Sequence, residues 1–198
     1  LCAILANGGA KDVNFNVKFD TSDRMVLPPL FKEIEEATKP FTLGACASDN
    51  GDNSLCKEFC SPSKSFSLSD CTNHHVWMNP PFNYKVAGEM IKHYLKCKAL
   101  APTTTSMCLM LPEYSINNMK RLLKDFVVLK RYPKYTPVVS VPDGKGGRTI
   151  LKPGLHFDMV VYYDPPQEQL PTISVVKDKQ DDKLIFQLPC KVAHSKDG

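Results

Sequence analysis

The order of predicted elements favours an α/β fold with a doubly wound, mostly parallel sheet and an antiparallel end. Three short apolar runs, at residues 41–44, 76–79 and 106–111, have the character of buried strands. Amphipathic helical stretches alternate with them, and β structure without helices follows after residue 127. At 198 residues the chain is long enough to bury a substantial core as one domain.

The first half of the chain supplies one helix and one strand. Residues 1–24 are polar and irregular, so we expect an N-terminal arm there. Pro28-Pro29 then opens an amphipathic helix with apolar residues at 30, 31, 34 and 37. The strand that begins at Phe41 breaks into small residues and then polar ones, and a polar loop leads to residue 76.

The second half supplies two predicted helices and most of the β structure. The apolar spacing predicts helices over 86–100 and 116–126, and strands at 106–112, 127–129, 137–141 and 156–163. We therefore expect the domain to occupy residues 25–164. Residues 165–198 begin with a Pro-Pro linker and form a C-terminal extension, with short strand candidates at 173–176 and 184–188.

The central motif is the turn that ends the strand at 76–79, Asn79-Pro80-Pro81-Phe82. Prolines cannot continue a sheet ladder, so the chain leaves the strand at Asn79. This places an amide side chain, two carbonyls and an aromatic face at the carboxyl edge of the sheet, where open α/β sheets bind ligands.

The motif suits chemistry on a planar amine. The exocyclic amine of adenine is a poor nucleophile because its lone pair is delocalised into the ring. If the Asn79 side-chain oxygen and the Pro80 carbonyl accept its two N–H bonds, the nitrogen becomes tetrahedral and its lone pair becomes available. Phe82 can stack on a base swung out of its helix. The same four residues would suit an RNA base or a glutamine side chain, and an ordinary turn is the competing interpretation.

These residues resemble the phage-type DNA N-6-adenine methyltransferase family, and similar segments occur in eukaryotic retroelement polyproteins. The resemblance extends from about Asp23 to Asp164. It implies a Rossmann-like methyltransferase fold, S-adenosylmethionine as cofactor, and methylation of adenine in DNA. It also implies catalytic roles for Asn79, Pro80, Pro81 and Phe82, and cofactor contacts from Phe41, Leu43, Gly44, Ala45, Ala47, Asp49 and Asp70.

One position departs from the family pattern. Gly44 stands where the family has an aspartate, so a carboxylate that would hold the cofactor is missing. A charge-assisted hydrogen bond contributes roughly 1.5–3 kcal/mol. Asp49 could substitute, and Gly44→Asp would then raise cofactor affinity. The alternative is a catalytically silent nucleic-acid-binding or structural domain of a mobile-element polyprotein.

Composition sets the remaining expectations. Hydrophobic residues make up 42% and charged residues 23%, which are globular values, and no apolar run is long enough to span a membrane. The net charge of +4 permits a nucleic-acid partner without arguing for one. The eight cysteines show no disulfide framework, which favours an intracellular protein, cytoplasmic or nuclear. Cys56, Cys60, Cys71, His74 and His75 lack a second ligand pair, so no metal is expected. The start of the chain suggests a piece of a longer polypeptide.

Overall fold

The computed structural model describes residues 23–168, 174–177 and 184–187, so the predicted N-terminal arm lies almost wholly outside it. The chain divides into two compact units between Pro166 and Gln167. The first contains β1 (Met25–Val26), α1 (Pro28–Ala37), β2 (Leu43–Gly44), the 3₁₀ helix η1 (Phe66–Leu68), β3 (His75–Met78), α2 (Tyr84–Leu100), β4 (Ser106–Pro112), α3 (Glu113–Ile116), the 3₁₀ helix η2 (Asn117–Met119), β5 (Val127–Tyr132), β6 (Val139–Pro142), β7 (Arg148–Ile150) and β8 (Met159–Asp164).

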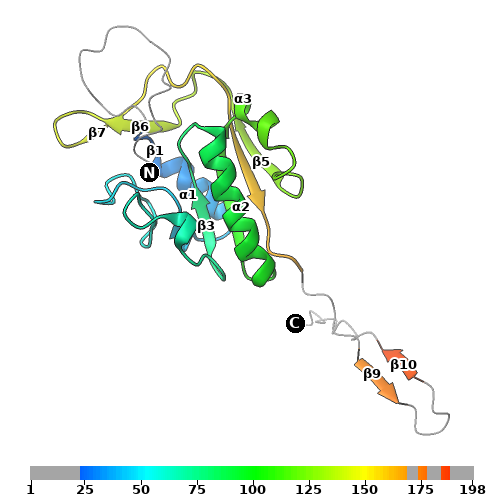
Figure 1. The fold of residues 1–198 in the computed structure, drawn as a ribbon. Coiled ribbons are helices and arrows are strands. Elements are labelled where there is room, and N and C mark those ends of the chain that lie inside the picture. Colours follow the sequence, from blue (N-terminus) through cyan, green and yellow to red (C-terminus); the bar gives the residue numbers. More distant parts are fainter. Residues whose placement is uncertain (1–22, 169–173, 178–183, 188–198) are drawn as a thin grey trace, which may run out of the picture. The chain divides into compact units, whose positions relative to one another are not determined.

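The second unit contains β9 (Ser174–Lys177) and β10 (Leu184–Gln187), which pair antiparallel (Figure 1). The short strands predicted in this part of the chain are therefore confirmed.

The first unit is built on a five-stranded sheet in the order β2-β3-β4-β8-β5. β2, β3 and β4 run parallel, with Leu43 opposite Val76 and Val76 opposite Met107. The prediction of three neighbouring parallel strands at 41–44, 76–79 and 106–111 is confirmed. A second sheet, in the order β1-β6-β7, is antiparallel.

The predicted Rossmann-like fold with a mostly parallel sheet is wrong. β8 lies antiparallel between β4 and β5, so half of the pairings in the larger sheet are antiparallel. The connection from β2 to β3 is irregular apart from η1, whereas a doubly wound sheet would have an α-helix there. The protein is a mixed α/β fold with one mixed and one antiparallel sheet in this unit.

The helix predicted over 116–126 is also wrong. α3 ends at Ile116, and η2 and successive turns follow, with Leu123 N–H donating to the Met119 carbonyl at 3.1 Å. These turns still bury Met119, Leu123 and Phe126, the side chains that suggested the helix. Asn117 and Asn118 favour turns because their side chains compete for backbone hydrogen bonds.

The larger sheet is covered on both faces. Alternate strand residues point to opposite faces, so Met78 and Leu109 pack in one core cluster with Ile91 of α2. Trp77 and Met110 pack in the other with Ile34 of α1. Figure 1 shows α2 lying along the sheet, with α1 behind it.

His75 is the most buried imidazole that the structure describes, with 2% of its surface exposed. Its Nδ1 lies 2.8 Å from Ser106 Oγ, and its ring stacks on Phe41 with centroids 4.5 Å apart. Burial, with a smaller contribution from the charge of Lys39, lowers the pKa of His75 to about 4. His75 is thus the buried first residue of β3.

This histidine predicts a pH dependence of stability. In the unfolded chain this histidine has a pKa near 6.5, so between pH 6.5 and 4 it is protonated, whereas the folded protein keeps it neutral. Folding therefore becomes less favourable as pH falls. The free energy of unfolding should lose on the order of 2–3 kcal/mol between pH 6.5 and 4 from this residue. Denaturant titrations at several pH values in this range give the free energy of unfolding as a function of pH. This free energy should fall less steeply with falling pH for His75→Gln than for the parent, and the exposed His156→Gln is the control. If the free energy of unfolding depended equally on pH in all three proteins, His75 would not be the cause of the pH dependence.

Candidate adenine-binding site

The Asn-Pro-Pro-Phe turn lies at the carboxyl end of β3, the strand between β2 and β4. Pro80 is buried and Pro81 is exposed. The Asn83 side chain accepts hydrogen bonds from the backbone N–H groups of Lys85 and Val86 and so caps α2. The turn is therefore fixed at both ends, by a strand before it and a capped helix after it.

The Asn79 side chain places a buried acceptor, its Oδ1, directly after β3. Its Nδ2 donates to the Arg24 carbonyl at 3.3 Å. Its Oδ1 is buried and accepts no hydrogen bond from the residues that the structure describes. An unsatisfied buried polar atom costs roughly 1–3 kcal/mol, so a native protein that retains one often uses it. Here the atom is the one that the sequence assigned to binding an amine.

Aromatic side chains gather beside this amide. The Phe82 ring lies edge-to-face with Phe157, with centroids 5.7 Å apart, and Phe157 does the same with Tyr114 at 5.0 Å. We call Phe82, Tyr114 and Phe157 the aromatic wall. The Arg24 guanidinium lies over the Phe82 ring, 4.6 Å from its centroid. A base that stacks on this face of Phe82 would have to displace Arg24.

Sequence reasoning missed Arg24, Tyr114 and Phe157. Tyr114 follows Leu111-Pro112 at the end of β4, the strand next to β3, and this position on the same edge was an available signal. The Glu113 N–H donates to the Asp158 carbonyl at 2.9 Å and ties the start of α3 to the segment that carries Phe157. No sequence pattern indicated that contact.

The seven predicted cofactor residues do not form one site. Four of them are buried hydrophobic side chains: Phe41, Leu43, Ala45 and Ala47. Phe41 contacts His75, Trp77 and Phe31 and belongs to the core on the α1 side of the sheet. The Ala45 N–H donates to the Trp77 carbonyl and the Ala47 N–H to the Cys60 carbonyl. These backbone donors are therefore used within the fold.

Gly44 is covered by the segment 56–60 of the same chain. Its N–H donates to the Glu58 carbonyl, and the Cys60 N–H donates to the Gly44 carbonyl, so residues 58–60 extend the edge of β2. A Cβ at Gly44 would lie 3.3 Å from Cys56 Cβ and 3.5 Å from Phe59 Cβ. This close packing explains why a glycine, and not an aspartate, occupies position 44.

The two predicted acids have different environments. Asp49 accepts hydrogen bonds from the N–H and hydroxyl of Ser63, and bonds to Ser61 and Ser63 lower its pKa. Asp70 accepts from the Thr72 N–H, which lowers its pKa too. Asp49 thus closes its own loop, whereas Asp70 lines a cavity.

That cavity has a volume of about 480 Å³ and includes two of the predicted cofactor residues, Leu43 and Asp70. Its other lining residues are Glu58, Cys60, Ser63, Lys64, Ser65, Leu68 and Ser69. Leu43 pairs with Val76, which lies three residues before Asn79. At about 3.3 Å per residue, the cavity begins roughly 10 Å along the strands from the turn.

These surroundings reverse the expected effect of Gly44→Asp. The new carboxylate would be buried against Cys56 and Phe59, so we expect a loss of about 2–4 kcal/mol in the free energy of unfolding rather than a gain in cofactor affinity. Gly44→Ala is the control and should lose only about 1–2 kcal/mol, because it adds the crowded Cβ without the charge. Denaturant titration measures both. A fully stable Gly44→Asp protein would show that open space lies beside β2.

Comparison with protein families and with curated proteins finds no match to this chain. The assignment of the site therefore depends on the residues themselves. Among the residues that the structure describes, no helix has the length and apolar character needed to cross a membrane.

Proposed function

We propose that the chain transfers a methyl group from S-adenosylmethionine to the exocyclic amine of adenine in DNA. The observation that carries this proposal is the buried Oδ1 of Asn79, which has no hydrogen-bond partner among the described residues and lies at the carboxyl end of β3 beside the aromatic wall. The chemistry depends on the ends of neighbouring strands, not on a mostly parallel sheet.

The residues of the turn would act on the amine directly. Asn79 Oδ1 accepts one N–H of the amine, which satisfies the orphaned acceptor, and the Pro80 carbonyl accepts the other. Both bonds favour the tetrahedral form of the nitrogen, so they strengthen as the reaction proceeds and stabilise the transition state. Phe82 holds the plane of the base by stacking, once Arg24 has moved from its face.

The cavity beside β2 has a chemistry that fits the cofactor. S-adenosylmethionine, when bound, supplies an electrophilic methyl group. The volume of about 480 Å³ is in the range of small-molecule sites. The carboxylates of Glu58 and Asp70 suit the hydroxyl and ammonium groups of such a ligand, and Leu43 offers apolar surface. These three residues would hold it, whereas Phe41, Gly44 and Asp49 are engaged elsewhere in the fold.

A DNA partner suits the exposed basic residues near α3. Lys120, Arg121 and Lys134 are exposed and form no salt bridge within the described part of the chain. By contrast, Lys130 pairs with Glu33 and Arg131 with Glu113. Phosphate contacts would use these three cations, of which Lys134 also lies over the Tyr135 ring, and such a role is consistent with a cytoplasmic or nuclear location.

The structure also favours a second candidate, an adenine-binding domain without methyl transfer. The carboxylate expected after Leu43 is absent, and Cys56 and Phe59 fill its place. Asp49, the possible substitute, is held by Ser63. In this candidate the adenine end of the site remains and the cofactor end is lost.

Calorimetric titration with S-adenosylmethionine distinguishes the two candidates. Methyl transfer requires submillimolar binding that weakens in Asp70→Asn, with the exposed Asp125→Asn as the matched control. DNA with an extrahelical adenine should in either case bind more tightly than the same DNA with purine, which lacks the amine. If the protein prefers adenine to purine but does not bind S-adenosylmethionine, the second candidate is supported. If it shows neither the preference nor cofactor binding, both candidates are excluded.

A further inference from the structure

Three potential metal ligands meet on the α2 side of the larger sheet. Cys71 precedes β3, and His93 and Cys97 lie one turn apart on α2. One ligand atom from each, two thiol sulfurs and an imidazole nitrogen, lies within 4.8 Å of the other two. We call Cys71, His93 and Cys97 the thiol–imidazole cluster. It shares no residue with the Asn79 turn, so a role for this cluster is independent of the proposed function.

The spacing of the cluster is close to that of a tetrahedral site. With zinc–sulfur and zinc–nitrogen bonds of about 2.3 and 2.0 Å, neighbouring ligand atoms lie roughly 3.5–3.8 Å apart. Cys97 Sγ lies 3.6 Å from His93 Nε2, which is already in this range. The upper limit of 4.8 Å for the remaining pairs requires a closing movement of about 1 Å or less.

The surroundings hold the ligands in place. Cys71 is fully buried, Cys97 is 6% exposed, and His93 is half-buried. The Phe66 ring packs edge-to-face on the His93 ring, with centroids 5.4 Å apart. The buried Cys60 thiol donates to Ser69 Oγ, and Cys60 packs in the same core cluster as Cys71 and Cys97.

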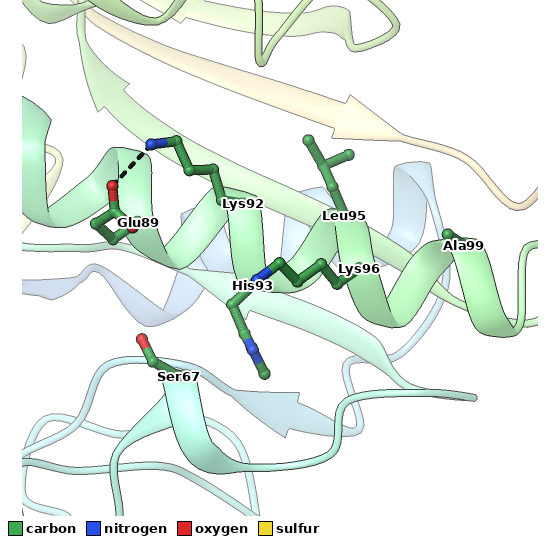
Figure 2. Close-up of a pocket in the computed structure, with 7 residues that line it drawn as sticks. All are labelled: Ser67, Glu89, Lys92, His93, Leu95, Lys96 and Ala99. Atoms are coloured by element: carbon green, nitrogen blue, oxygen red, sulfur yellow. Dashed lines mark hydrogen bonds and ion pairs between the residues drawn. The ribbon is translucent and has the colours of Figure 1, made fainter.

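His93 connects the cluster to the surface. It lines a cavity of about 650 Å³ together with Ser67, Glu89, Lys92 and Lys96. Figure 2 shows its ring directed from α2 toward the segment that carries Ser67. This cavity gives an ion a route to ligands that are otherwise buried.

We propose that Cys71, His93 and Cys97 bind a zinc ion, which fastens the loop before β3 to α2. Each thiol releases its proton to solvent on binding, and the two thiolates neutralise the charge of the ion, so no net charge is buried. His93 binds through Nε2, and its proton moves to Nδ1. Two sulfurs and one imidazole nitrogen form a donor set that zinc prefers to magnesium or calcium.

The sequence predicted no metal because the cysteine pair at 56 and 60 has no matching second pair. The fold instead brings Cys71 together with a histidine and a cysteine that lie one turn apart on α2, far along the chain from it. The metal-free interpretation is that His93 Nε2 donates to the Ser69 carbonyl, 2.8 Å away, and the thiols are ordinary core residues.

Cobalt(II) titration of the reduced, metal-free 198-residue protein tests the proposal without any substitution. We expect one cobalt ion per chain, with thiolate charge-transfer bands in the near ultraviolet and the intense visible bands of a tetrahedral ion, and displacement by zinc. Absent charge-transfer bands, or the weak spectrum of a six-coordinate ion, would overturn it.

Variants assign the ligands. Cys71→Ser, Cys97→Ser and His93→Gln should each weaken zinc binding at least tenfold and remove the stabilisation against heat that zinc gives the parent. Cys56→Ser and His74→Gln are the matched controls, since they remove a thiol and an imidazole outside the cluster, and should bind zinc as the parent does. Equal zinc binding in the ligand and control variants would overturn the assignment, as would a Cys71–Cys97 disulfide in protein purified under reducing conditions.

Discussion

Asn79→Ala is expected to lower the rate of methyl transfer by ~10²–10³, by analogy with removal of one oxyanion-hole donor. The bond from the amine to Oδ1 strengthens as the nitrogen becomes tetrahedral, so its loss should lower turnover more than substrate binding. The fold should change little. Among the described residues, this side chain forms one hydrogen bond, from Nδ2 to the Arg24 carbonyl, worth about 1 kcal/mol.

Single-turnover rates and calorimetric binding of S-adenosylmethionine measure the two effects separately. Asn118→Ala is the control, because it removes an exposed amide from the segment after β4 and should keep the parental rate. An Asn79→Ala protein that methylates as fast as the parent would show that the orphaned acceptor serves another purpose.

Asp164→Ala is expected to destabilise the protein by about 3–5 kcal/mol. The Asp164 carboxylate at the end of β8 lies 3.2 Å from Lys98 Nζ, and only 8% of the lysine side chain is exposed. The same carboxylate accepts the Tyr94 hydroxyl at 2.6 Å. Without it, an ammonium and a hydroxyl remain buried with their main partner removed. This loss is a large share of the free energy of unfolding of a typical domain, which is roughly 5–15 kcal/mol.

The double variant Lys98→Met, Asp164→Ala should regain part of this loss, because it removes the stranded charge as well. The exposed pair of Lys92 and Glu89 is the control, and Glu89→Ala should change the free energy of unfolding by less than about 1 kcal/mol. Urea titration measures all of these proteins. If Asp164→Ala lost no more than Glu89→Ala, the pair would not be buried in solution.

The sequence predicted the elements that local patterns specify. The apolar runs at β2, β3 and β4 formed neighbouring parallel strands, and the proline-initiated α1 and the amphipathic α2 formed where expected. The pairing of β8 between β4 and β5 was not predictable in this way, because strand order depends on contacts far apart in the chain. The spacing of apolar residues also could not distinguish the helix expected over 116–126 from successive turns that bury the same side chains.

The candidate site shows the same division. The turn at Asn79 was predicted because its prolines dictate where the strand ends, and its chemistry lies in consecutive residues. Arg24 and Phe157 join it through tertiary packing alone. Apart from Asp70, the predicted cofactor residues were chosen along one run, 41–49, whose side chains the fold separates. Phe41, which precedes β2, and Leu43, within β2, belong to opposite core clusters, and Gly44 is covered by residues 56–60.

Methyl transfer itself is the most direct test of the central claim. The parental protein is incubated with S-adenosylmethionine labelled in its methyl group and with DNA, RNA or protein as acceptor. The DNA is then digested and its nucleosides are separated. We predict label in N-6-methyladenine from DNA and none when every adenine is replaced by purine. Label only in RNA or protein would move the activity to another planar amine, and an unlabelled set of acceptors would contradict the claim that this chain is a methyltransferase.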